Sequence, residues 1–169
     1  MNHGYRGVEK TQEILERYGR FRLPIHFTEN TLVSGQIMPP HIVDLNDYQV
    51  DEWPSTPDGL ERQAREVETH YRTLFENPLV ESVTWWGLLD GGWLKAPSGL
   101  LTIDSQPKPA YDVLHNLVRK EWWTPDQTLL ADDEGAVNAS GFLGDYEAVC
   151  DGETIPFSVE RAADPSARH

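Results

Sequence analysis

The sequence predicts an α/β protein, and three observations lead to that prediction. Helix-like and strand-like segments alternate over the first two-thirds of the 169-residue chain, in the order helix, strand, helix, strand, helix. Such alternation is typical of parallel strands joined by crossover helices. Two parallel strands leave faces and edges of a sheet uncovered, so this part is expected to be a slice of a larger fold. After Trp123 the pattern changes to short alternating runs, which predicts a small β module.

The first helix and the first strand are predicted from two different periodicities. A helix closed by Gly19 is indicated by residues at helical spacing, namely Val8, Thr11, Ile14, Leu15 and Tyr18. The segment 21–29, FRLPIHFTE, then alternates as a strand does. Side chains alternate along a strand, so Glu29 is expected on the same side as Phe27 and Ile25 unless a bulge intervenes.

The second helix has clear boundary signals. Residues 30–57 contain several prolines and glycines with little periodicity, which predicts a long loop, and loops of that length are usually functional. Thr56 is a candidate cap and Pro57 suits the first helical turn. Asn77-Pro78 ends the segment. The stripe expected to face the core is Leu60, Ala64, Val67, Tyr71, Leu74 and Phe75.

A second strand, a loop and a last helix follow. The strand is expected over 79–88, and the loop GGWLKAPSGLL comes after it. A helix starting near Pro109 is predicted to bury Ala110, Val113, Leu114, Leu117 and Val118.

The chain is therefore expected to divide into three parts. The α/β part covers 1–123, and a β-rich module of three or four short antiparallel strands covers 124–160. The remainder, 161–169, is expected to be a disordered tail.

Composition and charge exclude several classes of partner. The formal net charge of −14 argues against a nucleic-acid partner, which requires a basic surface, and is compatible with a neutral or cationic ligand. The single Cys150 excludes an internal disulfide framework and a multi-cysteine metal site. No apolar run approaches the roughly 20 residues of a membrane span, so no membrane partner is expected. The start, MNHGYRGVEK, has no apolar core of a signal peptide.

Glu29 is the first candidate for chemistry. Ligands and catalytic groups gather at the carboxyl ends of parallel strands, where a glutamate can act as nucleophile or general base. A structural role, capping a following turn or pairing with an arginine, is an open alternative.

Tryptophans are the second candidate set. Trp85 and Trp86 end the second strand, Trp93 lies in the following loop and Trp53 lies in the long loop. Indole faces can stack on the apolar faces of sugar rings, whereas core packing is the alternative for each of them.

No metal or cofactor site is predicted. The histidines form no pair at ligand spacing, and His70 and His115 are expected to be surface or packed helical residues. The segment DLNDYQVDE has some features of a calcium loop, but Tyr48 stands where that pattern needs Asp or Asn, and its glycine is missing.

Three segments together resemble glycoside hydrolase family 10, the endo-1,4-β-xylanases. They are LPIHFTEN, then VTWWGLLDGGW about 55 residues later, then GLLTIDSQPKPAYDVL, and the resemblance covers roughly residues 1–120. The family fold is a (β/α)8 TIM barrel, so the resemblance implies that the two strands are its seventh and eighth. It also implies that Glu29 matches the catalytic nucleophile and that Trp86 and Trp93 match sugar-binding tryptophans. Asp90 matches a family Asp to which no role is assigned, and GFLGDYEAV is similar to a β-rich tail found after some of these barrels.

The chain departs from the family pattern at two points. The family commonly has Glu-Leu-Asp where this chain has Glu29-Asn30-Thr31, and that Asp helps to hold a histidine that supports the nucleophile. The family acid/base lies in an Asn-Glu-Pro motif that does not occur in these 169 residues. A full barrel takes roughly 250 residues. The chain is therefore expected to be the C-terminal part of an enzyme, such as a truncated gene product that starts at an internal Met.

The sequence thus predicts a retaining glycoside hydrolase acting on xylan-like polysaccharides or oligosaccharides, present as its nucleophile-carrying part. The isolated chain is expected to be inactive, and its full-length parent to be secreted. Two alternatives stay open: a non-catalytic carbohydrate-binding relic, and a similar barrel acting on another glycan.

Overall fold

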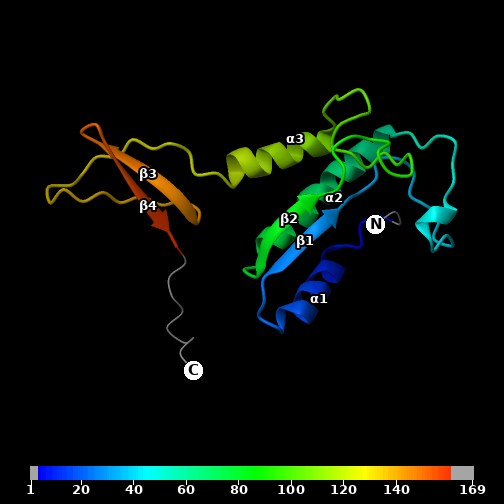
Figure 1. Cartoon of the computed structure of the whole chain (residues 1–169), viewed down its shortest axis with the longest axis horizontal. Helices are drawn as coiled ribbons and strands as arrows, with labels where there is room; N and C mark the ends of the chain where they lie inside the picture. The colour runs from blue at the N-terminus through cyan, green and yellow to red at the C-terminus, as the bar shows by residue number, and fades with distance from the viewer. Residues whose placement is uncertain (1–3, 161–169) are drawn as a thin grey trace. The chain divides into compact units, whose positions relative to one another are not determined.

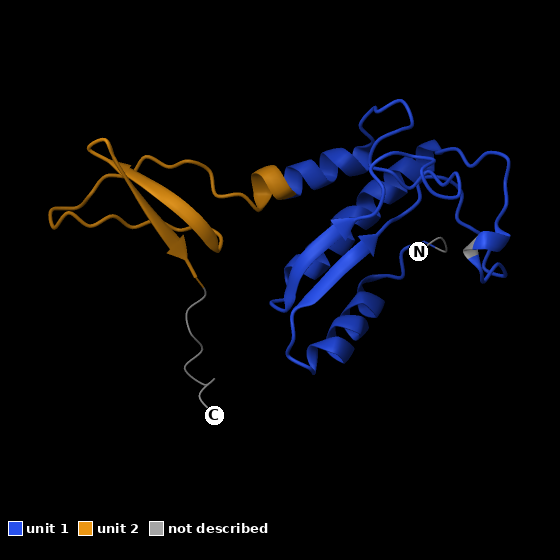
Figure 2. Cartoon of the chain, in the orientation of Figure 1, with its two compact units in different colours: residues 1–117 blue, residues 118–169 orange. Residues whose placement is uncertain are grey.

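A computed structural model describes residues 4–160 of the chain. The chain divides after Leu117 into two compact units, shown in blue and orange in Figure 2. The boundary expected after Trp123 lies inside the second of these units. Each unit is described by itself below.

The first unit begins with a helix and a strand. Helix α1, Val8–Gly19, buries Thr11 and Leu15. Strand β1 is Ile25–Asn30, so the prediction of a strand beginning at Phe21 was wrong. Phe21 and Arg22 instead form turns against the end of α1, and Arg22 has a φ of 53°, which interrupts an extended chain.

Strand β2, Val80–Trp85, pairs with β1 in parallel, as the alternation of elements predicts. The described residues contain no third strand in this sheet, so its outer edges lack a strand partner there. The strand stops at Trp85 and not near Leu88, because Gly87 has a φ of 80° and turns the chain away.

Helix α2, Pro57–Phe75, begins as predicted: the Thr56 side chain accepts a hydrogen bond from the Gly59 N–H at 3.1 Å. Val67, Tyr71 and Leu74 of the expected stripe are buried, but Phe75 is exposed. In Figure 1 this helix lies behind the strands, and it packs against α1, β2 and α3, Pro109–Asn116.

The long segment 31–56 is irregular, as predicted, but much of it is part of the core. Its regular structure is one short 3-10 turn, η1, Leu45–Asp47. Gly35 bridges to Ser55, and the Trp53 indole N–H donates to the Gln36 carbonyl oxygen at 2.9 Å. The buried apolar side chains of this segment are Leu32, Val33, Met38 and Trp53.

Helix α3 starts at Pro109, as predicted, and buries Ala110, Leu114 and the following Leu117. The helix is then continued by a π-helical turn, η2, Leu117–Glu121. The wider turn changes the helical phase, and Val118 is exposed and not buried as expected.

The second unit contains one antiparallel hairpin, of β3, Gly144–Cys150, and β4, Glu153–Val159. The prediction of three or four strands was wrong, because residues 124–143 form none. The Tyr146 hydroxyl lies 2.8 Å from the hydroxyl of Thr124 and donates to the Phe142 carbonyl oxygen at 2.6 Å. The predicted disordered tail, 161–169, lies outside the described residues.

Candidate functional site

The carboxyl end of β1 is irregular at the residue singled out by the sequence. The pairing register shifts between Phe27 and Asn30, and across this shift Glu29 is exposed while Asn30 is buried. Strict alternation would have kept Glu29 on the half-buried side of Ile25 and Phe27, and the alternation is broken at this register shift. Within residues 4–160 the Glu29 side chain makes no hydrogen bond or ion pair. Neither structural alternative, a turn cap or an arginine pair, is present there.

Asn30 fixes the backbone that carries Glu29. Its side-chain amide nitrogen donates to the carbonyl oxygens of Phe27 at 2.9 Å and Thr84 at 3.0 Å, which joins the ends of both strands. Its amide oxygen lies 3.0 Å from Nε2 of His70 on α2. Because the amide nitrogen is used by two carbonyls, the oxygen faces His70, and His70 donates through Nε2.

His70 is a packed histidine, one of the two outcomes expected for it. Its ring lies edge-on to Tyr5 and Phe27, with centroid separations of 5.5 and 6.1 Å. Burial lowers the pKa of His70 to about 4, so the ring is neutral at neutral pH. His70 therefore donates to the amide oxygen of Asn30 as an uncharged imidazole.

Trp86 lies at the same strand end as Glu29. The backbone N–H of Trp86 donates to the Asn30 carbonyl oxygen at 2.7 Å. This bond lies next to the last paired residues of the two strands, Asn30 and Trp85. The Trp86 side chain is 46% exposed, whereas Trp53 is only 6% exposed and packs against Val33 and Ala96. Of the two alternatives for the tryptophans, core packing holds for Trp53, while Trp86 presents an indole to solvent.

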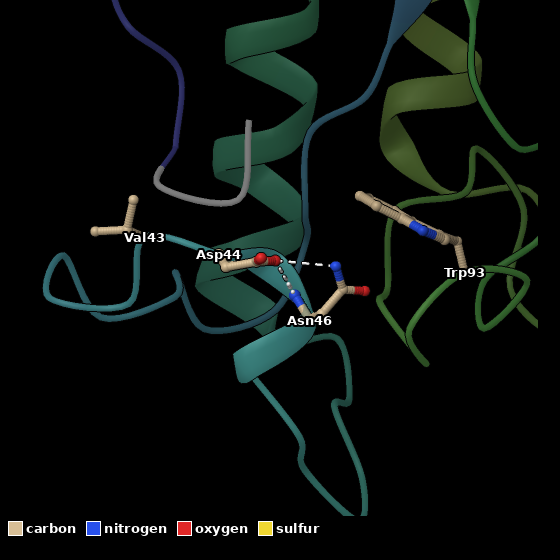
Figure 3. Close-up of a pocket in the computed structure, with 4 residues that line it drawn as sticks. All are labelled: Val43, Asp44, Asn46 and Trp93. Carbon is tan, nitrogen blue, oxygen red and sulfur yellow. Dashed lines mark hydrogen bonds between the residues drawn. The ribbon is translucent and has the colours of Figure 1, made fainter.

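Trp93 lines an open hollow of about 510 Å³ together with Val43, Asp44 and Asn46. Figure 3 shows the indole of Trp93 on one side and the three residues of the long segment on the other. Trp93 is partly exposed, and the hollow lies within the first unit. Within residues 4–160 no hydrogen bond, ion pair or ring contact joins Trp93 to Glu29 or Trp86.

The loop that carries both tryptophans is held by a buried ion pair. Lys108 Nζ donates to Asp90 Oδ1 at 2.9 Å, and the same oxygen accepts from the Gly99 N–H at 2.8 Å. The Lys108 side chain has an exposed fraction of 0%. Burial lowers the pKa of Lys108, and the hydrogen bond and charge of Asp90 oppose that shift.

Asp90 therefore has a structural partner that the sequence did not predict. One signal was available: Lys108 immediately precedes Pro109 at the start of α3, where the helix dipole disfavours a cation. A lysine there needs a compensating carboxylate. Thr31, whose substitution for the family Asp put the support of Glu29 in question, is buried and lies 3.4 Å from the Ser98 carbonyl oxygen. In this chain Asn30, and not residue 31, contacts a histidine.

Neither a metal-binding cluster nor a membrane-spanning helix occurs within residues 4–160. Residues 4–160 contain no group of three or more His, Cys, Asp or Glu side chains placed to hold a metal ion. The same residues include no helix long and apolar enough to cross a bilayer.

A comparison with solved structures finds likeness to xylanases. Xylanase XynB from Paenibacillus barcinonensis, solved with a conduramine derivative, is 22% identical with a TM-score of 0.52; the match covers 67% of this chain and 34% of that one. A thermostable mutant of Xyn10A from Cellvibrio japonicus is 23% identical with a TM-score of 0.51, over 67% and 36% of the two chains. A GH10 endoxylanase from a sugarcane soil metagenome is 23% identical with a TM-score of 0.51, over 66% and 35%.

These similarities define a class of fold. Over about two-thirds of its length the chain has an α/β fold like that of part of a xylanase, consistent with part of a (β/α)8 barrel. The chain spans about a third of the length of these xylanases. No protein-family model matches the chain, and a search of curated proteins finds no match either.

Proposed function

We propose that this chain is the C-terminal part of a retaining glycoside hydrolase of family 10, acting on β-1,4 bonds of xylan or a similar glycan. One observation carries the proposal. Glu29 and Trp86 lie at the same end of a parallel strand pair, in a fold like that of xylanases. The Glu29 carboxylate has no partner within residues 4–160, and the Trp86 indole is exposed. Carboxylates at that end of parallel strands are typical of barrel catalytic sites.

Glu29 is the nucleophile in this proposal. A carboxylate oxygen attacks the anomeric carbon, the bond to the leaving oxygen breaks, and a glycosyl ester forms. Asn30 positions the backbone of Glu29 through its bonds to both strands. Trp86 and Trp93 stack on the apolar faces of the bound sugars.

The acid/base of the pair is not supplied by this chain in the proposal. A retaining enzyme needs a second carboxyl group about 5–5.5 Å from the nucleophile to protonate the leaving oxygen and then activate water. We expect purified chain 1–169 to bind xylo-oligosaccharides without hydrolysing xylan. The full-length protein is expected to be exported, because polymeric xylan lies outside the cell.

A substrate whose leaving group needs no protonation tests Glu29 in the isolated chain. We expect 2,4-dinitrophenyl 2-deoxy-2-fluoro-β-xylobioside to lose dinitrophenolate as Glu29 forms an ester, because that leaving group departs with its electron pair unaided. The fluorine slows both steps by disfavouring the oxocarbenium-like transition state. Intact-protein mass spectrometry and peptide mapping are the measurements, and Glu29 should carry the label.

Two variants complete the test. Glu29→Gln should abolish labelling, while Glu81→Gln, which changes an exposed carboxylate on the neighbouring strand, should leave it unchanged. Labelling of another residue would contradict the role of Glu29. A chain that binds xylotetraose but acquires no label would support the alternative, a non-catalytic carbohydrate-binding protein. Hydrolysis of xylan by purified 1–169 would contradict the proposed need for an absent acid/base.

A further inference from the structure

The hollow beside Trp93 lies between two loops that are joined by hydrogen bonds. Lys95 Nζ donates to the carbonyl oxygens of Val50 at 3.4 Å and Asp51 at 3.1 Å. Beneath this contact, Trp53 and Ala96 belong to one buried cluster, against which Tyr48 packs. These contacts hold residues 48–53 of the long segment against the turn that carries Trp93.

The turn that carries Trp93 is equally constrained. The Ala96 N–H donates to the Trp93 carbonyl oxygen at 2.9 Å, and the intervening Leu94 and Lys95 have φ values of 49° and 54°. Such left-handed positions persist in non-glycine residues only when the surroundings hold them. The turn that carries Trp93 is thus held in place, which reduces the ordering cost of binding at this side of the hollow.

The polar side chains opposite Trp93, Asp44 and Asn46, have hydrogen-bond acceptors left over. Asp44 Oδ1 accepts from both the backbone N–H and the side-chain Nδ2 of Asn46, each at 2.9 Å (Figure 3). A carboxylate only accepts, so Nδ2 must face it and Asn46 Oδ1 is turned away. Within residues 4–160 the second Asp44 oxygen and Asn46 Oδ1 have no hydrogen-bond partner. The remaining capacity of both side chains is for accepting hydrogen bonds.

We infer that this hollow binds one neutral sugar ring and discriminates against a carboxylate-bearing one, with Asp44 and Asn46 as the specificity-determining residues. This inference rests on the proposed function and extends it from sugar binding to sugar selection. The ring stacks on Trp93, and its hydroxyl groups donate to Asp44 and Asn46. A uronic acid offers acceptors and a negative charge where Asp44 already supplies both, and like charges at close range repel.

Calorimetric titration of the full chain with xylotetraose, and with xylotetraose carrying one glucuronic acid side group, tests the inference. We expect the wild type to bind the neutral ligand more tightly. Trp93→Ala should weaken neutral binding about tenfold, through loss of the stacking surface. Asn46→Ala should weaken it about fivefold, through loss of one acceptor. Asp44→Asn keeps the bonds to Asn46 and should narrow the preference for the neutral ligand about fivefold.

The matched control is Asp47→Asn, which removes a charge from the 3-10 turn that follows Asp44, at a residue that does not line the hollow. It should leave both affinities unchanged. If Asp44→Asn and Asp47→Asn alter the preference equally, the inference is overturned. If Trp86→Ala weakens binding but Trp93→Ala and Asn46→Ala do not, the inference fails and the sugar-binding role of Trp93 fails with it, while the proposed roles of Glu29 and Trp86 stand. If the wild type binds neither ligand, both the proposed function and the inference are overturned.

Discussion

The Asp90→Asn substitution removes one negative charge from the loop that carries Trp86 and Trp93, and it preserves the shape of the side chain. The amide oxygen of Asn can still accept from the Gly99 N–H, now 2.8 Å from Asp90 Oδ1. Lys108 Nζ loses its counter-charge at 2.9 Å and keeps the Pro97 carbonyl oxygen at 3.3 Å. The variant therefore isolates charge compensation at a lysine whose side chain is 0% exposed.

Two energies, the lost charge attraction and the cost of deprotonating Lys108, limit the loss of stability expected for Asp90→Asn. The attraction between unit charges at the observed separation of 2.9 Å is about 6 kcal/mol with an effective dielectric constant of about 20. Lys108 can instead release its proton, which costs about 5 kcal/mol at neutral pH from the usual pKa of 10.5. Removing one partner of a buried pair costs about 3–5 kcal/mol. We expect a loss of about 3–4 kcal/mol in the free energy of unfolding.

The loss should shrink as pH rises. Burial already lowers the pKa of Lys108, and losing Asp90 removes the two contributions that raise it. Between that lowered pKa and 10.5, the unfolded chain binds more protons than the folded chain, so the stability of the variant increases with pH. The free energy of unfolding of the wild type should also increase with pH, but by less and starting at a higher pH.

Urea unfolding followed by far-ultraviolet circular dichroism is the assay, because α1, α2 and α3 all lie in the first unit. The double variant Asp90→Asn/Lys108→Met should recover most of the loss, since it no longer buries an unpaired charge. Asp126→Asn, in the second unit, is the control for a change in net charge. A loss below about 1 kcal/mol for Asp90→Asn, or a double variant less stable than the single one, would refute the reasoning.

Two further predictions concern α2. Since burial lowers the pKa of His70 from 6.5 to about 4, the folded state should lose up to about 3 kcal/mol as pH falls through that interval. His70→Phe should remove this pH dependence in urea unfolding and His115→Asn should not; an unchanged profile in His70→Phe would contradict the assignment. Thr56→Ala should cost about 1 kcal/mol by removing the cap on the Gly59 N–H. Thr69→Ala, within the same helix, should cost less, and equal losses would argue against a specific capping effect.

Part of the candidate site was predictable because its residues follow directly from the ends of predicted strands. Glu29 and Trp86 lie at one strand end, as parallel pairing requires, although their roles in chemistry and sugar binding stay predictions. Asn30 was not singled out as a site residue, and Asp44 and Asn46 were noted only within a segment with features of a calcium loop. Each matters through partners distant in sequence or through a hollow between two loops, and local patterns carry no signal for either.

The sequence by itself determined the helices and the parallel arrangement. Thr56 and Pro57 start α2 through local capping and a preset backbone angle, and the helical spacing of apolar residues needs no distant information. Tertiary structure decided where the strands begin and end, because a strand exists only where a partner accepts its hydrogen bonds. The strand predicted over 21–29 is therefore observed only over Ile25–Asn30, and residues 124–143 form no strand.

Tertiary structure also decided the surroundings of each polar and aromatic side chain. Trp53 and Trp86 have the same chemistry, yet one is packed in the core and the other is exposed, because only the first meets a cluster from another loop. Glu29 is exposed where the register of β1 shifts, next to Asn30, whose side chain bonds to both strands and to α2. The identity of a residue sets the chemistry available to it, and packing with distant segments sets which part of that chemistry is used.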